Sequence, residues 1–327
     1  MTPFGTRWSI SIRTGVLMRF RKQVWLLSMG LLLAASHVHA QFSQLYTFGD
    51  SLSDTGNLAS VTVNFPPPFY MNRVSNGPVA VETLAALLGL EAKASLHLVG
   101  PAQGTNYAVV GAKARGRDTI DLAAQVEAFL QHHGHAAPPD ALYMLMIGGN
   151  DIRDARDADD MAAQEIIRQT ASAIITHIET LAAAGAMRFL VVNAPDLGAI
   201  PETRLIAEAT GMPSFIDLAT RRTETFNQVL ADDVDRLRAE FGLQIALVDL
   251  FASGRAVIDN AIAYHLDNVT DPCFSIKEGF HFHPDCKYGT NFDAFAYFDA
   301  IHPTAKVHER LGRIFFAFAP VPPPAVE

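Results

Sequence analysis

The stretch "YTFGDSLSDTGN", residues Tyr46–Asn57, joins an apolar run to a cluster of small and polar residues. An apolar run that ends at a glycine is typical of a buried strand that gives way to a turn. Ser51 therefore stands at the carboxyl end of a predicted strand. It is either a nucleophile or the first hydroxyl of a loop, and the rest of the chain must distinguish the two.

Short apolar or β-branched runs alternate with longer segments of helical period along the chain. This alternation is typical of the α/β class, in which helices cover the faces of a mostly parallel sheet. Five strands are predicted, at residues 44–48, 106–110, 142–147, 189–192 and 245–248. The predicted helices cover residues 79–88, 120–132, 161–184, 215–241 and 304–317. The segment 161–184 has the clearest pattern, because its apolar residues recur at spacings of three and four.

Two segments break this alternation. Residues 64–70, "NFPPPFY", contain three prolines, which remove backbone donors and fix φ. Residues 265–298 form a long, aromatic-rich stretch without a clear period. Long loops in compact α/β domains usually cover or shape a site, so we expect both segments near one.

The first 40 residues are predicted to be a secretory signal peptide. Five basic residues precede the apolar run 24–35, and small residues follow it up to a predicted cleavage site at Ala40. A membrane anchor is the alternative, although about a dozen apolar residues are few for a membrane span. Met18 is an alternative start. Residues 41–327 are predicted to form a single domain, since 49% of the sequence is hydrophobic and only 18% is charged.

The charge of the chain argues against a nucleic-acid partner. The sequence contains 25 basic and 34 acidic residues, a net charge of −9. Without residues 1–40 the balance is 20 to 34, or about −14, so there is no basic surplus to neutralise phosphates. After Ala40 no apolar run is long enough for a transmembrane helix.

Both cysteines of the chain, Cys273 and Cys286, lie in the stretch 265–298. In an exported protein this pair is predicted to form a disulfide, with a free buried pair as the alternative. His281, His283 and Asp285 lie nearby and raise the question of a metal site. We predict none, because an exported cysteine prefers its partner cysteine and no second cluster occurs at metal-ligand spacing.

The residues that follow the predicted strands are those that acyl transfer needs. Ligands of open α/β sheets bind outside the carboxyl ends of the strands. Ser51 follows the first strand and supplies a hydroxyl, while Asp299 and His302 in "FDAIHPT" are spaced to share one face of a turn. The predicted oxyanion donors are the backbone N–H groups of Ser51 and Gly111 and the side-chain amide of Asn150. Gly111 suits this role because it has no Cβ to keep a substrate oxygen from the main chain.

Four blocks of the sequence resemble the GDSL/SGNH esterase and lipase family, whose markers are a Ser, a Gly, an Asn and a His. "FGDSLSDTGN" matches the first block through Ser51, and "NYAVVGA" matches the second through Gly111. "IGGNDI" matches the third through Asn150, and "DAIHPT" matches the last through Asp299 and His302. The flanking "VVNAPDLGAIP" and "FNQVL" resemble the secreted bacterial lipase and phospholipase branch. Val110 departs from the pattern, because a second small residue is common there.

The resemblance implies a three-layer α/β/α sandwich, flavodoxin-like, with no metal or organic cofactor. It implies an exported, periplasmic or extracellular serine hydrolase of carboxylic esters, that is, a lipase or esterase. Lysophospholipase, phospholipase A and acyltransferase activities occur among such relatives. The implied partner is an ester or lipid substrate, with transient contact to a membrane surface. A polysaccharide O-acetyl esterase and a catalytically inert binding module on the same fold are the alternatives.

Other residues near the blocks are expected to have supporting roles. Asp50, Asp54 and Asn57 are predicted to hold the turn at Ser51 through hydrogen bonds from side chain to backbone. Asp151 is predicted to cap or orient the helix that follows Asn150. The aromatic residues of the irregular segments are expected to pack the loops together and, in smaller part, to line an acyl-binding cleft. They are Phe65, Phe69, Tyr70, Phe274, Phe282, Phe292, Phe295 and Tyr297.

Overall fold

A computed structural model describes residues 42–276 and 280–320. All of them belong to one unit, Gln41–Pro323. The predicted signal peptide lies outside the described residues. Among the described residues, no helix is both long and apolar enough to cross a membrane.

The centre of the fold is a parallel four-stranded sheet of order β1-β2-β3-β4. Its strands are Leu45–Gly49 (β1), Leu142–Met146 (β2), Arg188–Val192 (β3) and Gln244–Val248 (β4). All residues of β1 and β2 are buried, as expected of strands covered on both faces. Gly49 pairs with Met146 at the end of the ladder, so the residues that follow β1 and β2 emerge side by side.

The structure corrects the predicted five-stranded sheet, because residues 106–110 do not form a regular strand. The segment runs beside β1, and the Tyr107 N–H donates to the Thr47 carbonyl at 2.7 Å, but the pairing is only an isolated bridge. The ladder is interrupted at the Gly49 N–H, which donates to the Gln125 side chain. The Gly49 carbonyl still accepts from the Val109 N–H at 3.1 Å, in addition to the Gln125 side chain. The segment still lies beside β1, on the edge opposite to β2. From β1 the chain therefore runs first to one side of the sheet, to residues 106–110, and then to the other side, to β2, β3 and β4. Ligands of flavodoxin-like folds bind at such a switch point.

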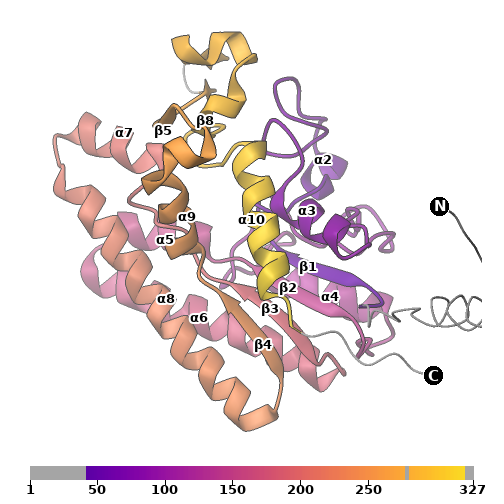
Figure 1. Ribbon diagram of the computed structural model, residues 1–327. Coiled ribbons are helices and arrows are strands. Elements are labelled where there is room, and N and C mark those ends of the chain that lie inside the picture. The colour runs from indigo at the N-terminus through magenta and orange to yellow at the C-terminus, as the bar shows by residue number, and fades with distance from the viewer. Residues whose placement is uncertain (1–41, 277–279, 321–327) are drawn as a thin grey trace, which may run out of the picture. The chain divides into compact units, whose positions relative to one another are not determined.

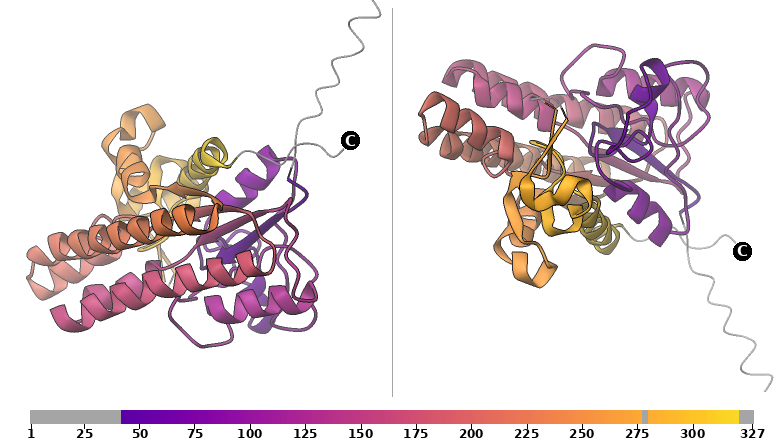
Figure 2. Two further views of the ribbon diagram at one scale, coloured as in Figure 1. Left: turned by 90° about the horizontal axis from the view of Figure 1, so that it is seen from below. Right: turned by 90° about the horizontal axis from the view of Figure 1, so that it is seen from above.

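Helices cover both faces of the sheet and confirm the α/β sandwich (Figures 1 and 2). One face carries α4 (Leu122–His132), α6 (Asp160–Ala183) and α8 (Ser214–Phe241). The other face carries α3 (Ala80–Leu87) and α10 (Ala305–Phe318), which pack against each other. These five helices match the predicted ones to within about two residues. The helix expected next to Asn150 is α5 (Gly149–Asp157). Three further helices of the described residues were not predicted: α2 (Asn57–Val61), α7 (Pro201–Thr210) and α9 (Leu250–Asp259).

Helix α6 shows how the sequence period determines packing. Its buried residues Ile167, Ala171, Ile174, Ile178 and Leu181 form the single apolar face that the spacing predicts. The side chain of Asp159 caps the helix by accepting from the Ala162 N–H at 2.9 Å. This cap satisfies one of the backbone donors that a helix leaves unpaired at its first turn.

Residues 261–276 and 280–298 form a small accessory lobe beside the sheet (Figure 1). The lobe contains two parallel strands, Asn268–Pro272 (β5) and Phe295–Tyr297 (β8), and a hairpin of Phe274–Ser275 (β6) and His281–Phe282 (β7). The lobe also contains three short 3₁₀ helices: η1 (Ala261–Tyr264), η2 (Pro284–Gly289) and η3 (Phe292–Ala294). A disulfide joins Cys273 to Cys286, as predicted.

Candidate active site

Ser51 lies in a tight turn at the carboxyl end of β1. The Asp50 carboxylate accepts from the Leu52 N–H at 3.0 Å, and the buried Asp54 carboxylate accepts from the N–H groups of Gly56, Asn57 and Leu58. Asp54 also accepts from the Val110 N–H at 2.9 Å, which ties the second sequence block to the first. The predicted role in holding the turn is therefore confirmed for Asp50 and Asp54. It is wrong for Asn57, whose side chain donates to the carbonyls of Asn106 and Ala108 instead.

The structure brings Ser51, His302 and Asp299 into one hydrogen-bonded line. The Ser51 hydroxyl lies 2.8 Å from Nε2 of His302. The other ring nitrogen, Nδ1, lies 2.8 and 2.9 Å from the two carboxylate oxygens of Asp299. A carboxylate accepts from Nδ1–H, so this geometry leaves Nε2 free to accept the proton of the Ser51 hydroxyl.

Asp299 is held in its ionised form at this position. Burial alone would raise its pKa, but the adjacent His302 charge and hydrogen bonds lower the pKa below its usual value. The backbone N–H groups of Ile301 and His302 donate to Asp299 Oδ1 at 2.8 and 2.7 Å. The carboxylate is thus fixed by its own turn before it contacts the imidazole.

The three predicted oxyanion donors lie on segments that contact one another. Among the described residues, neither the Ser51 N–H nor the Gly111 N–H has a hydrogen-bond partner. Gly111 has a φ of +85°, which favours glycine at this position. The Asn150 side chain donates from Nδ2 to the Ala112 carbonyl at 3.0 Å, and its second N–H has no partner among the described residues. Three donors therefore remain for an oxygen atom placed between these segments.

Asp151 orients its helix rather than capping it, which corrects half of that prediction. Its buried carboxylate accepts from the Ala114 and Arg115 N–H groups at 2.8 and 3.2 Å, while the residue before the helix is Gly148. Asp151 thus joins α5 to the loop that carries Gly111. Burial raises the pKa of Asp151 to about 6, and burial raises the pKa of Asp50 to the same value.

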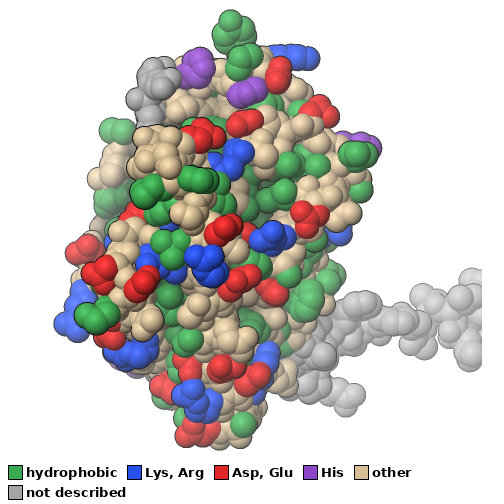
Figure 3. Space-filling view, turned by 90° about the vertical axis from the view of Figure 1, so that its left-hand side faces the viewer, with side chains coloured by type: hydrophobic (Ala, Val, Ile, Leu, Met, Phe, Trp, Pro, Cys, Tyr) green, Lys and Arg blue, Asp and Glu red, His purple; other side chains and the backbone are tan. Residues whose placement is uncertain are grey.

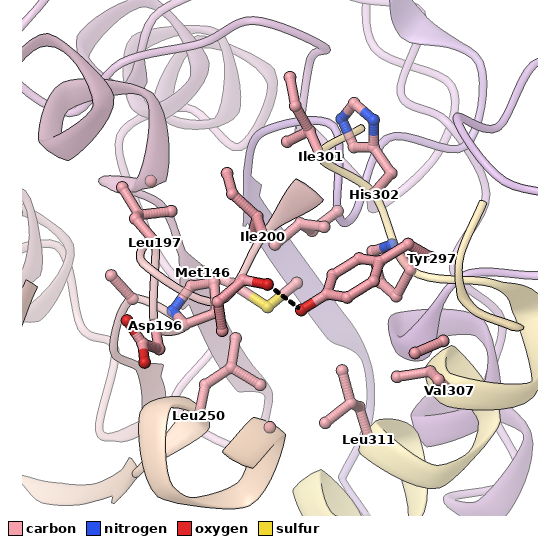
Figure 4. A pocket seen from close by; sticks show the side chains of 18 of the residues that line it. Met146, Asp196, Leu197, Ile200, Leu250, Tyr297, Ile301, His302, Val307 and Leu311 are labelled. Carbon is pink, nitrogen blue, oxygen red and sulfur yellow. Dashed lines mark hydrogen bonds between the residues drawn. The ribbon is translucent and has the colours of Figure 1, made fainter. Parts of the chain in front are cut away.

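A largely apolar cavity opens beside Ser51, Asn150 and His302 (Figure 4). The space between its walls is about 1010 Å³ when the part open to solvent is counted. The Tyr297 side chain projects into the cavity, and its hydroxyl donates to the Ala199 carbonyl at 3.2 Å. Aliphatic residues of the lining come from the end of β2, from the loop after β3, and from α9 and α10: Met146, Ile147, Leu197, Ile200, Leu250, Val257, Ile258, Val307 and Leu311.

The other polar side chains of the lining are engaged with the protein. Asp196 accepts from Arg255 at 2.7 Å and from Thr220 at 2.8 Å. Asn193 accepts from the Leu250 N–H at 2.7 Å. Apart from Ser51, Asn150 and His302, the cavity therefore offers a ligand mainly hydrocarbon surface.

Most of the aromatic residues singled out in the sequence pack the accessory lobe instead of lining this cavity. Phe274, Phe292, Phe295 and Phe298 form a buried cluster with both cysteines, and Phe69 and Phe282 pack against it. Of the eight predicted residues, Tyr297 alone is in the lining described above. The prediction that packing dominates is correct, whereas the aliphatic lining from α9 and α10 was not predicted.

The histidines near the disulfide do not form a metal cluster. His283 Nδ1 accepts from the Asp285 N–H at 3.2 Å, and Cys286 is bonded to Cys273. Within residues 42–276 and 280–320, no three His, Cys, Asp or Glu side chains are grouped to hold a metal ion.

On the face shown in Figure 3, acidic and basic side chains are interspersed rather than separated into patches of one sign.

A parallel α/β sheet with a Ser–His–Asp line at the carboxyl ends of its strands is the architecture of a serine hydrolase. Comparison with known families narrows this class. Residues 45–315 match the model of the GDSL-like Lipase/Acylhydrolase family, and the chain belongs to this family. The resemblance noted in the four sequence blocks is thereby confirmed.

Individual relatives share part of the chain. Lipase 1 of Photorhabdus luminescens is 34% identical over 189 residues, which are 57% of this chain and 27% of that protein. Phosphatidylcholine-sterol acyltransferase of Aeromonas hydrophila is 31% identical over 183 residues, 54% of this chain and 51% of that protein. The chain thus spans about a quarter to a half of the length of these relatives. A solved acetylxylan esterase from Geobacillus stearothermophilus is 15% identical with a TM-score of 0.47, covering 86% of this chain and 95% of its own.

Proposed function

We propose that this chain is a serine hydrolase of carboxylic esters with an apolar acyl group. Ser51 Oγ attacks the ester carbonyl while His302 Nε2 takes its proton, and Asp299 stabilises the imidazolium. The oxyanion accepts hydrogen bonds from Ser51, Gly111 and Asn150. The alcohol leaves with the proton from His302, and water then releases the acid from Ser51 by the same steps.

The observation that carries the acyl preference is the cavity beside the nucleophile. Aliphatic side chains of α9 and α10 form its far wall, and the carboxylate of Asp196 is paired with Arg255. Each buried methylene of an acyl chain gains about 0.8 kcal/mol on leaving water, so a longer chain gains affinity there. An acetyl group would leave most of this surface unused.

A substrate panel tests the proposal against polysaccharide deacetylation. Purified mature protein is assayed with p-nitrophenyl esters from acetyl to palmitoyl, with phospholipids and lysophospholipids, and with acetylated glycans. We expect kcat/KM to rise with chain length beyond acetyl by at least tenfold. Maximal activity on acetylated glycan, with no gain from longer chains, would reject the acyl preference.

A fluorophosphonate probe tests the chemistry itself and separates it from an inert binding module. Such probes react only with an activated serine, so we expect labelling of wild-type protein and none of Ser51→Ala. Ser51→Ala should also lower turnover by several orders of magnitude without loss of fold. Full esterase activity of that variant would reject the nucleophile assignment.

We also propose that the protein is exported, with residues 1–40 removed as a signal peptide. The Cys273–Cys286 disulfide supports this, because such bonds persist in oxidising compartments. The intact mass of the protein recovered from periplasm or medium tests it. We expect a mature chain that begins at Gln41. A mass that includes residues 1–40 would contradict removal of the signal peptide.

A further inference from the structure

Two charged residues that the proposed chemistry does not use lie directly behind the oxyanion donor Asn150. Arg153 follows Asn150 by three residues on α5, and its Nη1 donates to Asn150 Oδ1 at 3.3 Å. The rest of the same guanidinium is bound to Glu202 on α7: Nε donates to Oε2 at 2.9 Å and Nη2 to Oε1 at 2.7 Å. The Glu202 carboxylate thus fixes the orientation of the Arg153 guanidinium, and one N–H of this guanidinium donates to the side-chain amide of Asn150.

These contacts allow only one orientation of the Asn150 amide. Its oxygen faces Arg153, which has donors only, and its nitrogen faces the Ala112 carbonyl, which is an acceptor only. A flipped amide would place NH₂ against the guanidinium and oxygen against oxygen. The observed orientation therefore fixes which N–H of Asn150 remains for a substrate oxygen.

Glu202 is itself firmly held and connects both halves of the site. It is 7% exposed, and Arg156, which is 2% exposed, donates to it from Nη1 at 2.9 Å. Its backbone N–H donates at 2.7 Å to the carbonyl of Ala300, the residue that follows Asp299. One residue thus supports the oxyanion donor through its side chain and the Asp299–His302 turn through its backbone.

We propose that Arg153 and Glu202 are positioning residues that hold the Asn150 amide ready for the oxyanion. The inference rests on the proposed function, because it assigns a partner to one of that function's donors. It is not a claim that either residue touches substrate. A preorganised donor stabilises a transition state more than one that must first reorient, so the pair acts on kcat rather than on KM.

A double-mutant cycle tests the proposal with an activated ester as substrate. The cycle compares wild type, Arg153→Met, Asn150→Ala and the double variant. Loss of an oxyanion donor costs about 10²–10³ in kcat, so loss of its orientation should cost about 10- to 100-fold. We expect that decrease for Arg153→Met, with KM within about threefold, and less than a twofold further decrease in the Asn150→Ala background.

Matched variants keep the test specific. Arg168 forms a similar pair with Glu165 on the exposed surface of α6, so Arg168→Met should leave kcat unchanged. Glu202→Gln should lower kcat in the same direction as Arg153→Met, because a glutamine nitrogen cannot accept from the guanidinium. If Arg153→Met does not fold, Arg153→Lys takes its place, since an ammonium lacks the planar fork that binds carboxylate and amide together.

Two results would overturn the inference: an unchanged kcat in Arg153→Met, or an equal loss in wild-type and Asn150→Ala backgrounds. The second result would mean that Arg153 acts on the fold in general. Failure of the proposed function is distinguishable, because it would appear as undiminished activity in Ser51→Ala measured alongside.

Discussion

Nε2 of His302 lies 2.8 Å from the hydroxyl of Ser51, although 251 residues separate them in the chain. The approach depends on a closed turn at the end of the accessory lobe. The Phe298 N–H donates to the His302 carbonyl at 2.8 Å, and the Thr304 N–H donates to the Ala296 carbonyl at 3.0 Å. The turn therefore projects His302 from a fixed base toward the carboxyl end of β1.

Asp299→Asn should lower kcat by about 10³- to 10⁴-fold through the tautomer of His302. Two backbone N–H groups already donate to Asp299 Oδ1, so the amide of the variant places its oxygen there and its NH₂ toward Nδ1. Nδ1 then faces this NH₂ at the position of Oδ2, 2.9 Å away, and the neutral amide no longer holds a proton on Nδ1 as the carboxylate does. The tautomer with the ring proton on Nε2 becomes favoured, and in this tautomer Nε2 cannot accept the proton of Ser51. Steady-state kinetics on an activated ester measures the effect.

Asp293→Asn is the matched control for this prediction. Asp293 lies in η3 of the same lobe, and it is exposed. The kcat of the Asp293→Asn variant should equal that of the wild type. An Asp299→Asn variant that folds and retains more than a tenth of wild-type activity would contradict the role given to Asp299.

Leu311→Trp should change the acyl-chain preference. Leu311 lies on α10 in the far wall of the cavity and is 6% exposed, so a larger side chain must occupy part of the cavity. We expect kcat/KM to fall about tenfold or more for long-chain esters and to stay within about threefold for the acetyl ester. Leu311→Met, which keeps the side-chain volume, should behave like the wild type.

A uniform loss on all chain lengths in Leu311→Trp would contradict this assignment of the cavity. Overpacking costs about 1–3 kcal/mol, so the thermal transition of the variant is measured in parallel. Val257→Phe is a second test of the cavity, because Val257 on α9 also lines it and phenylalanine is larger. It should show the same dependence on chain length.

The residues at the carboxyl ends of the strands can be predicted well from the sequence, because parallel strands place the residues that follow them side by side. Ser51, Asn150, Asp299 and His302 could be selected from strand ends and spacing alone. The interruption at Gly49 could not be foreseen, because it depends on Gln125, which is 76 residues away and fills a backbone position with its side chain. Residues 106–110 have the composition of a strand but lose part of the ladder for that reason.

The cavity and the contacts behind Asn150, the proposed oxyanion donor, could not be predicted from sequence patterns either. Periodicity identifies the buried face of α10 but not which of its residues borders a void. Helix α5, "GNDIRDARD", has too few apolar residues to show a helical period. The Arg153–Glu202 pair joins residues 49 positions apart, and its effect on Asn150 depends on side-chain geometry alone.

Removal of the disulfide should destabilise the accessory lobe. The bond closes a segment with a sequence separation of 13, for which chain entropy predicts about 3 kcal/mol. The Cys273 N–H donates to the Tyr297 carbonyl at 3.0 Å, two residues before Asp299, so the loss should also weaken the support of the turn that carries Asp299 and His302. We expect a lower thermal transition and lower activity above ambient temperature in the Cys273→Ala/Cys286→Ala variant.

Reductant provides the control for the disulfide. It should lower the thermal transition of the wild type toward that of the double variant and leave the double variant unchanged. The intact mass after thiol alkylation reports the state of the two cysteines directly. Two alkylated thiols in protein prepared without reductant would contradict the bond.

His308 should make the folded state sensitive to acid. It is 1% exposed, its Nδ1 accepts from the Ala80 N–H at 3.2 Å, and its Nε2 has no partner among the described residues. Burial, with a smaller contribution from the charge of His302, lowers the pKa of His308 to about 3. Between pH 6.5 and about 3 the unfolded chain binds a proton at this residue and the folded chain does not. Its contribution to the free energy of unfolding therefore falls as the pH falls, by about 1.4 kcal/mol per pH unit.

His308→Asn isolates this contribution, because asparagine offers the Ala80 N–H an acceptor but does not titrate. The buried carboxyls of Asp50 and Asp151, whose pKa values are raised to about 6, act in the opposite direction, since they favour the folded state as the pH falls below 6. The readout is therefore the difference between variant and wild type in urea unfolding at pH 7, 6 and 5. We expect the wild type to lose stability relative to His308→Asn over this interval, and the exposed His281→Asn to follow the wild type. Parallel pH profiles for wild type and His308→Asn would show that His308 gains its proton without unfolding, contrary to the environment described for it.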